Sequence, residues 1–274
     1  MDPGSLRDAL TALLGLATGV MSGAFGVGGA VVSTPGIRLL GVPALVAIGT
    51  TLPSIVPSAL SGSLRYRNER LIDWRAVACT VPVGLGASVA GALLSEEVPG
   101  EGHLLMVATA ALLGVTAWRM ARGRDPLPAR ARLAQDATAG GSGGAVSCRA
   151  ATVVGLVAGA LSGLLGIGGG VVLVPAFVAA GLALKVAIAT SLVCVGAFAV
   201  PGTLAHALLG NVDWRVALLL AATVVPGARL GAALTVRADD RCLRLAVAAF
   251  LGVIAVAYAA GEMAALAGPA PGPG

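Results

Sequence analysis

The hydrophobic residues of this chain form ten apolar segments, separated by polar turns or by glycine. About 20 consecutive apolar residues make a helix long enough to cross the roughly 30 Å hydrocarbon layer of a bilayer. The third, fourth, eighth and ninth segments reach that length, while the first, second, sixth and seventh are short or interrupted by glycine. We therefore predict an all-α polytopic membrane protein. The segments cover residues 9–24, 27–41, 43–64, 75–95, 103–120, 150–165, 168–183, 185–209, 214–235 and 243–262.

The two halves of the chain are copies of one another. Shifting the sequence by 140 residues aligns residues 15–35 with 155–175 without a gap, and the register holds as far as the DWR sequences at 73–75 and 213–215. Over residues 15–75 there are 23 identities in 61 positions. Such self-similarity indicates a duplicated structural unit. The predicted organisation is a first transmembrane repeat over 1–120, a basic linker over 121–148 and a second transmembrane repeat over 149–274.

The composition agrees with lipid as the solvent. Of 274 residues, 57% are hydrophobic and 11% are charged, and the mean hydropathy is +0.92. A soluble domain carries about 25% charged residues, so we exclude a water-soluble enzyme. The first segment could be mistaken for a signal peptide, but its copy in the second half indicates a retained membrane segment.

The net charge of +5 predicts orientation rather than nucleic-acid binding. Cytoplasmic loops of membrane proteins are rich in Lys and Arg. If the linker is cytoplasmic and each long segment crosses once, 14 basic residues lie inside, and only Arg7, Arg38 and Arg215 lie outside. This solution gives two inverted-topology repeats of about five segments each. A parallel arrangement places five basic residues outside and fits less well.

Glycine clusters interrupt the first two segments of each repeat at matching places. Paired breaks of this kind in an inverted repeat indicate a transport site near the midplane. Glycine permits the turn and leaves backbone amides accessible, and a helix N-terminus at the turn favours anions. Close helix packing is the alternative role, and we prefer it for the GxxxG steps upstream, at Gly15, Gly19 and Gly23 and their copies. The candidate site glycines are Gly26, Gly28, Gly29, Gly166, Gly168, Gly169 and Gly170.

Four hydroxyls and one arginine complete the candidate substrate site. Thr50 and Thr51 align with Thr190 and Ser191, and such hydroxyls either replace ligand hydration or bond to their own helix. Arg229 lies within an apolar segment, where it either contacts the anion or extends to the cytoplasmic surface.

Other polar groups have less specific assignments. The DWR sequences read as helix starts, with Asp as the cap and Trp at the membrane interface. His206 is a possible gate, or else an interfacial histidine bonded to backbone. The 13 carboxylates all fall in loops or at segment ends, so neither a carboxylate proton relay nor a cation cage is predicted. We expect no metal site, no cofactor and no enzymatic activity, because the four Cys and two His show no metal, redox or hydrolase spacing.

The doubled pattern GLxxGxxSGxxGxGGxxVxxP, followed by a TS pair and HxxxGNVDWR, resembles the TauE/SafE sulfite exporter family of bacterial membrane permeases. The resemblance implies an inner-membrane protein that exports sulfite, sulfoacetate or a related sulfur oxyanion. The first half departs from the pattern, with Thr51 in place of serine and no glycine before Asp73.

From these features we predict a transporter for a small sulfur-containing anion that works by alternating access. Its partners are the substrate anion and the lipid bilayer, and a homodimer remains open. The alternatives are a transporter for another small solute, such as an organic acid, an amino acid or a metal ion, or a membrane scaffold or sensor that transports nothing.

Overall fold

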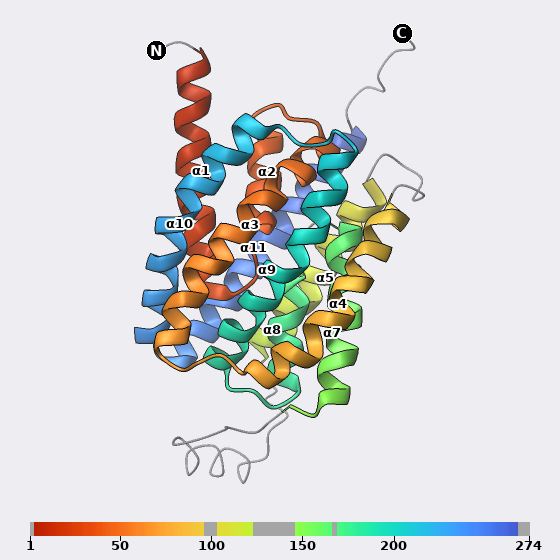
Figure 1. Ribbon diagram of the computed structural model, residues 1–274. Helices are drawn as coiled ribbons and strands as arrows, with labels where there is room; N and C mark the ends of the chain where they lie inside the picture. The colour runs from red at the N-terminus through yellow and green to blue at the C-terminus, as the bar shows by residue number, and fades with distance from the viewer. Residues whose placement is uncertain (1–2, 96–102, 123–145, 166–168, 268–274) are drawn as a thin grey trace.

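The computed structural model describes residues 3–95, 103–122, 146–165 and 169–267, and every regular element among them is a helix (Figure 1). Ten helices follow the ten predicted segments, which confirms the all-α fold for the described part of the chain. They are α1 Pro3–Phe25, α2 Ala30–Leu39, α3 Ala44–Asn68, α4 Trp74–Ser95, α5 His103–Ala121, α7 Cys148–Leu165, α8 Gly170–Ala179, α9 Leu184–Leu208, α10 Trp214–Arg237 and α11 Asp240–Ala267. Most of the predicted linker lies outside the described residues.

Four of the described helices are long and apolar enough to cross a membrane by length and composition. They include α9 and α10, as predicted. The first segment was expected to be marginal in length, and α1 is longer than that because it begins before the apolar run, continues through Arg7 and has 23 residues. The four candidate spans are Leu6–Phe25, Leu184–Leu208, Trp214–Arg237 and Asp240–Gly261. The helices α2 and α8 are short, with 10 residues each.

The closest helix contacts join the two repeats. Helix α1 packs along α10, and α7 packs along α4. Glycine allows this approach, because a Cβ built on Gly23 would lie 2.9 Å from the Cα of Ala228, and one on Gly159 would lie 2.7 Å from the Cα of Gly84. The predicted packing role of these upstream glycines is therefore confirmed.

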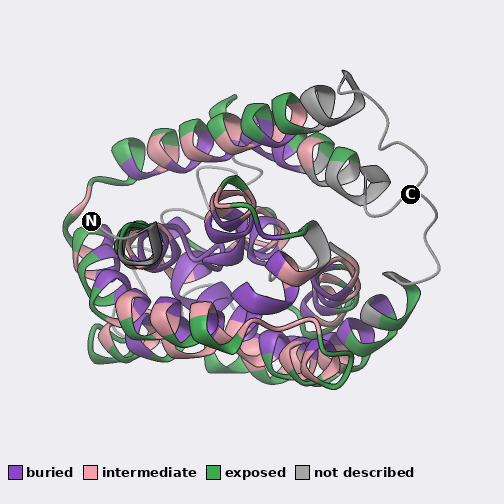
Figure 2. Ribbon diagram, turned by 90° about the horizontal axis from the view of Figure 1, so that it is seen from above, coloured by how far each residue is buried: buried purple, intermediate pink, exposed green. Residues whose placement is uncertain are grey.

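Two groups of helices result, and each takes helices from both repeats. Ser61 of α3 bonds to Val225 of α10, and Thr50 at the start of α3 bonds to Asp213 at the start of α10, so these two helices run in the same direction. We call α1, α3 and α10 the first mixed bundle, and α4, α7 and α9 the second mixed bundle. Helices α5 and α11 pair with each other along one side of both bundles (Figure 2).

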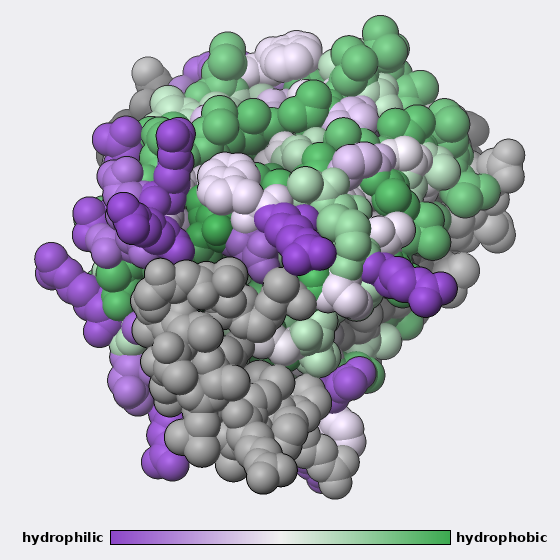
Figure 3. Space-filling view, turned by 60° about the horizontal axis from the view of Figure 1, so that its bottom comes forward, coloured by the Kyte–Doolittle hydropathy of each residue, from purple (hydrophilic) through white to green (hydrophobic). Residues whose placement is uncertain are grey.

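Basic residues gather at one end of the molecule. We call this end the linker face, because α5 ends and α7 begins there, and we call the opposite end the termini face, where α1 begins and α11 ends (Figure 1). Purple, hydrophilic side chains ring the linker face in the space-filling view, while much of the neighbouring surface is apolar (Figure 3). The described basic residues at the linker face are Arg65, Arg67, Arg70, Arg75, Arg119, Arg122, Arg149, Lys185, Arg237, Arg241 and Arg244.

A disulfide joins Cys79 of α4 to Cys148 at the start of α7. The cysteines show no metal or redox spacing in the sequence, and this bond was not predicted from it. Their sequence separation of 69 residues concealed the pair, but α4 and α7 begin at the same face and lie side by side, with Cα atoms 5.5 Å apart. Cys194 and Cys242 are free thiols.

Candidate functional site

The chain breaks between α1 and α2 and before α8 depend on glycine. Gly26 has φ +65°, Gly28 has φ +83° and Gly169 has φ +68°. These are left-handed backbone conformations that other residues adopt only with strain. The carbonyl oxygen of Gly29 then accepts hydrogen bonds from the N–H groups of Val32 and Ser33 as α2 begins. Each short helix thus starts directly from a glycine break.

Helix α2 turns back along α1. A Cβ built on Gly36 would lie 2.6 Å from Leu14, and one on Gly29 would lie 2.5 Å from Thr18. Contacts that run in opposite order along the two helices show that α1 and α2 form a hairpin. Gly169 lies against Ala158 of α7 in the same way, and these two residues are the repeat equivalents of Gly29 and Thr18.

The two breaks meet inside the protein. A Cβ built on Gly170 would lie 2.6 Å from the carbonyl oxygen of Gly26 and would also clash with Val27. Ser191 of α9 donates a hydrogen bond to that same Gly26 oxygen at 2.9 Å. The structure therefore brings Gly26, Gly170 and Ser191 together, as the sequence predicted. Gly166 and Gly168 lie outside the described residues.

Buried hydroxyls surround the first break, and most of them were not predicted. Ser58 donates to Ser22 at 2.9 Å, and the Thr34 and Thr51 hydroxyl oxygens are 3.1 Å apart. Thr18 is fully buried, and its hydroxyl has no hydrogen-bond partner among the described residues. The hydroxyl residues concerned are Thr18, Ser22, Ser33, Thr34, Thr51, Ser54 and Ser58.

These hydroxyls make the site asymmetric. Five of the seven have apolar or thiol counterparts in the second repeat, and only Ser22 and Thr51 have the hydroxyl counterparts Ser162 and Ser191. Spacing in α3 was the available signal, because Thr51, Ser54 and Ser58 follow one another at three and four residues and so share one helix face. The first half departs from the family pattern, yet it carries most of the polar lining.

The Thr50 and Thr190 hydroxyls bond to the starts of helices in the other repeat rather than to the glycine breaks. The Thr50 hydroxyl accepts the backbone N–H of Asp213 at 2.9 Å, and Thr190 accepts that of Asp73 at 3.0 Å. Thr50 lies near the termini face and Thr190 near the linker face, since each contacts the start of a helix. Both side chains therefore have a structural partner in the other repeat.

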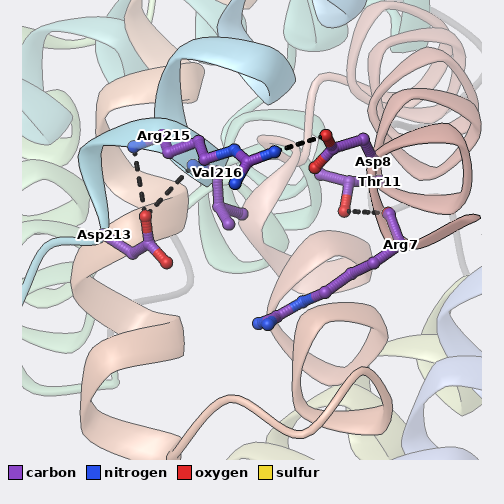
Figure 4. A network of polar contacts seen from close by, with 6 residues as sticks. All are labelled: Arg7, Asp8, Thr11, Asp213, Arg215 and Val216. Atoms are coloured by element: carbon purple, nitrogen blue, oxygen red, sulfur yellow. Dashed lines mark hydrogen bonds and ion pairs between the residues drawn. The ribbon is translucent and has the colours of Figure 1, made fainter. Parts of the chain in front are cut away.

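The DWR sequences begin α4 and α10, as predicted. The Asp213 carboxylate accepts hydrogen bonds from the N–H groups of Arg215 and Val216 at 3.1 and 3.2 Å, which caps α10 (Figure 4). The Arg215 guanidinium also forms an ion pair with Asp8 of α1 at 2.7 Å. Asp73 caps α4 in the same manner.

Arg229 does not lie at the glycine breaks. Its side chain is exposed on the outer face of α10, whereas its neighbours Gly227 and Ala228 are buried against α1. The expected contact with a midplane anion is therefore not supported, and the alternative role at the surface fits its position. Two residues along an α-helix correspond to about 200° of rotation, so Gly227 faces α1 and Arg229 faces away from it.

His206 is buried near the termini face. A Cβ built on Gly49 of α3 would lie 3.2 Å from the His206 Cβ, and the His206 carbonyl accepts the N–H of Asn211. It lies beside the start of α10 and away from the breaks.

The polar groups buried within the described structure include no carboxylate. Its buried polar and charged residues are Ser and Thr, with His206 in addition, and no Asp or Glu is among them. Backbone amides and hydroxyls are hydrogen-bond donors, and helix starts add partial positive charge. The chemistry of this interior suits an anion or a neutral polar solute.

Comparison with known proteins places the chain among membrane transporters. The model of the family described as "Sulfite exporter TauE/SafE" matches residues 11–258. The probable membrane transporter protein YunE of Bacillus subtilis is 28% identical over 239 residues, which is 81% of this chain and 86% of the relative. A probable membrane transporter protein of Xylella fastidiosa is 29% identical over 82% of both chains.

An archaeal relative is also similar to this chain over most of its length. A probable membrane transporter protein of Methanocaldococcus jannaschii is 23% identical over 89% of this chain and 92% of its own. No solved structure matches the chain significantly.

Proposed function

The chain belongs to the sulfite exporter TauE/SafE family and is a multi-pass membrane transporter, and we propose that it exports a small sulfur-containing anion across a bacterial inner membrane. Sulfite, sulfoacetate and related organosulfonates are the substrates that fit this proposal. The binding site lies where the two glycine breaks meet, and the first-repeat hydroxyls line it.

One observation carries the proposal. Gly170 contacts Gly26 and Val27 with no room for a side chain, so the start of α8 and the turn that leads into α2 converge at one place. A converging set of amides and hydroxyls without carboxylates replaces the hydration of an anion, and it would be a poor ligand set for a metal cation. We place Thr51, Ser191 and the unpartnered Thr18 hydroxyl in this lining, and we assign Thr50, Thr190 and Arg229 to structural or surface roles.

We further propose that the two repeats have inverted topology. The bonds Thr50–Asp213 and Thr190–Asp73 support this, because they join the first turns of α3 to the loop that follows α9, and the first turns of α9 to the loop that follows α3. Equivalent helices then run in opposite directions, as a two-fold axis in the membrane plane requires. The Arg-rich linker face would be cytoplasmic.

In the proposed alternating access, the first mixed bundle moves against the second, and the repeats do not move as units. Rocking one repeat against the other would separate α1 from α10 and α4 from α7, which are the glycine-mediated contacts. Movement of the first mixed bundle against the second preserves both contacts. It changes mainly the α3–α9 interface, where Ser191 meets the Gly26 break.

Export of an anion needs little coupling. An inside-negative potential of about 100 mV supplies roughly 2.3 kcal/mol for each charge that leaves, and the described interior has no buried carboxylate to carry a proton. We therefore propose a uniport. A transport rate in liposomes that does not depend on membrane potential but rises steeply with a pH gradient would contradict a uniport.

Counterflow with purified protein in liposomes tests the substrate. Radiolabelled sulfite, sulfoacetate and thiosulfate are compared with an organic acid, an amino acid and a divalent cation. We expect saturable exchange of at least one sulfur anion and none of the cation. Exchange of the organic acid or amino acid alone would assign another solute to the same site, and no exchange with any compound would favour a scaffold or sensor.

A further inference from the structure

An apolar groove of about 390 Å³ runs along the outer surface between α3 and α9. It extends from Val56 and Val200 to Arg67 and Trp74 at the linker face. The eleven steps along the helix from Val56 to Arg67 cover about 16 Å, which is roughly half the hydrocarbon thickness. The groove therefore has the length of one leaflet.

The mouth of the groove carries a positive charge. Arg67 is exposed there and makes no ion pair among the described residues. The nearby carboxylates are engaged elsewhere, because Glu69 pairs with Arg65 at 3.0 Å and Asp73 caps α4. Trp74 is 56% exposed beside Arg67, which is the usual position of tryptophan at the level of lipid headgroups.

A polar atom lies within the apolar wall. Ser63 lines the groove, and its hydroxyl is buried without a hydrogen-bond partner among the described residues. The second repeat offers no equivalent charge, because Ala207 corresponds to Arg67. The charged groove is therefore a single feature of the described chain, on the linker-face leaflet.

We propose that this groove binds one anionic phospholipid. An acyl chain occupies the apolar channel between α3 and α9, the phosphate group pairs with Arg67, and the ester region reaches Ser63. The apolar walls of the groove match the acyl chain of such a lipid, and the unpaired Arg67 guanidinium at its mouth matches the phosphate of the headgroup. The bound lipid touches both mixed bundles, and the site is independent of the transported substrate.

Native mass spectrometry of the purified full chain tests the site, with titration by phosphatidylglycerol or by phosphatidylcholine with the same acyl chains. We expect one phosphatidylglycerol to bind more tightly than phosphatidylcholine. An arginine near an anionic lipid contributes about 1 kcal/mol, so Arg67→Gln should lower phosphatidylglycerol affinity about fivefold and leave phosphatidylcholine affinity unchanged. Arg237→Gln is the matched control, because Arg237 is exposed at the same face outside the groove.

A second pair of variants tests the channel itself. Ala197→Phe fills the groove and should abolish tight binding of phosphatidylglycerol. Ala222→Phe, on the exposed face of α10, should leave that binding unchanged. Equal loss in Arg67→Gln and Arg237→Gln would overturn the proposal. So would a wild-type protein that binds both lipids equally, or a monodisperse Ala197→Phe variant with unchanged lipid binding.

Discussion

The hydroxyl of Ser191 on α9 donates a hydrogen bond to the carbonyl oxygen of Gly26, 2.9 Å away in the break between α1 and α2. The same hydroxyl also lies 2.9 Å from the Ile188 carbonyl of its own helix. A residue of the second repeat therefore holds the break of the first repeat in place. It does so across the interface between the two mixed bundles.

Replacing Ser191 with Ala should weaken both the fold and transport. The buried Gly26 carbonyl loses its side-chain donor, and an unsatisfied buried acceptor costs about 1–3 kcal/mol. We expect a lower thermal unfolding temperature and a several-fold slower counterflow. Ser88→Ala is the control, because Ser88 is a buried serine of α4 whose hydroxyl bonds to the Phe198 carbonyl within the second mixed bundle, outside the proposed site. Equal behaviour of the two variants would remove Ser191 from the site.

Gly170→Ala should abolish transport. The added Cβ would lie 2.6 Å from the Gly26 oxygen, so the two breaks must move apart. Gly86→Ala is the matched control, since a Cβ there meets nothing within 4 Å and alanine favours the helix by up to about 1 kcal/mol. Liposome counterflow and thermal unfolding should both show normal values for Gly86→Ala. Full transport by Gly170→Ala would show that the contact between the breaks is not the site.

Hydrophobic runs and the internal repeat predicted all ten described helices. An apolar run indicates a helix that packs within the bilayer, and the repeat shows that the second half copies the helix pattern of the first. The matching glycine clusters in the two halves also indicated that the regions around Gly26 and Gly170 would lie close together. The role of Arg229 stayed open between the anion site and the surface, because depth along a segment does not reveal which face a side chain occupies. The Cys79–Cys148 pair and the hydroxyls of Thr18 and Ser58 depend on which helices become neighbours, and the repeat alone does not determine that.

Arg229→Gln should leave transport nearly unchanged. The side chain is on the exposed face of α10, away from the Gly26 break, so its charge adds little to the field at the site. Counterflow rate and apparent KM should stay within about twofold of wild type, because surface substitutions usually change energies by less than about 0.5 kcal/mol. A tenfold rise in KM for the anion, with a normal unfolding temperature, would return Arg229 to the transport path.

Cross-linking distinguishes moving bundles from moving repeats. In a chain whose native cysteines are replaced by Ala, Ala59→Cys with Gly196→Cys joins α3 to α9, since a Cβ on Gly196 lies 2.6 Å from that of Ala59, within about 1 Å of disulfide spacing. We expect oxidation to stop transport and dithiothreitol to restore it. Transport that continues in the oxidised double variant would contradict bundle movement.

The native disulfide provides the complementary measurement. It joins α4 to α7 within the second mixed bundle, so the wild-type protein should transport at the same rate whether oxidised or reduced. If the repeats moved as units, the bond between α4 and α7 would block them, and reduction would raise the rate several-fold.

Cleavage of the linker tests both the disulfide and the orientation of the protein. Cys79 and Cys148 lie on opposite sides of residues 123–145, so a protease site inserted there yields two fragments held covalently by that bond alone. We expect one band on a non-reducing gel and two bands after reduction, and Cys148→Ser should give two bands in both cases. Since the linker face is Arg-rich, inside-out vesicles should be cut and right-side-out vesicles protected. The reverse protection pattern would place the linker face outside the cell and overturn the proposed export direction.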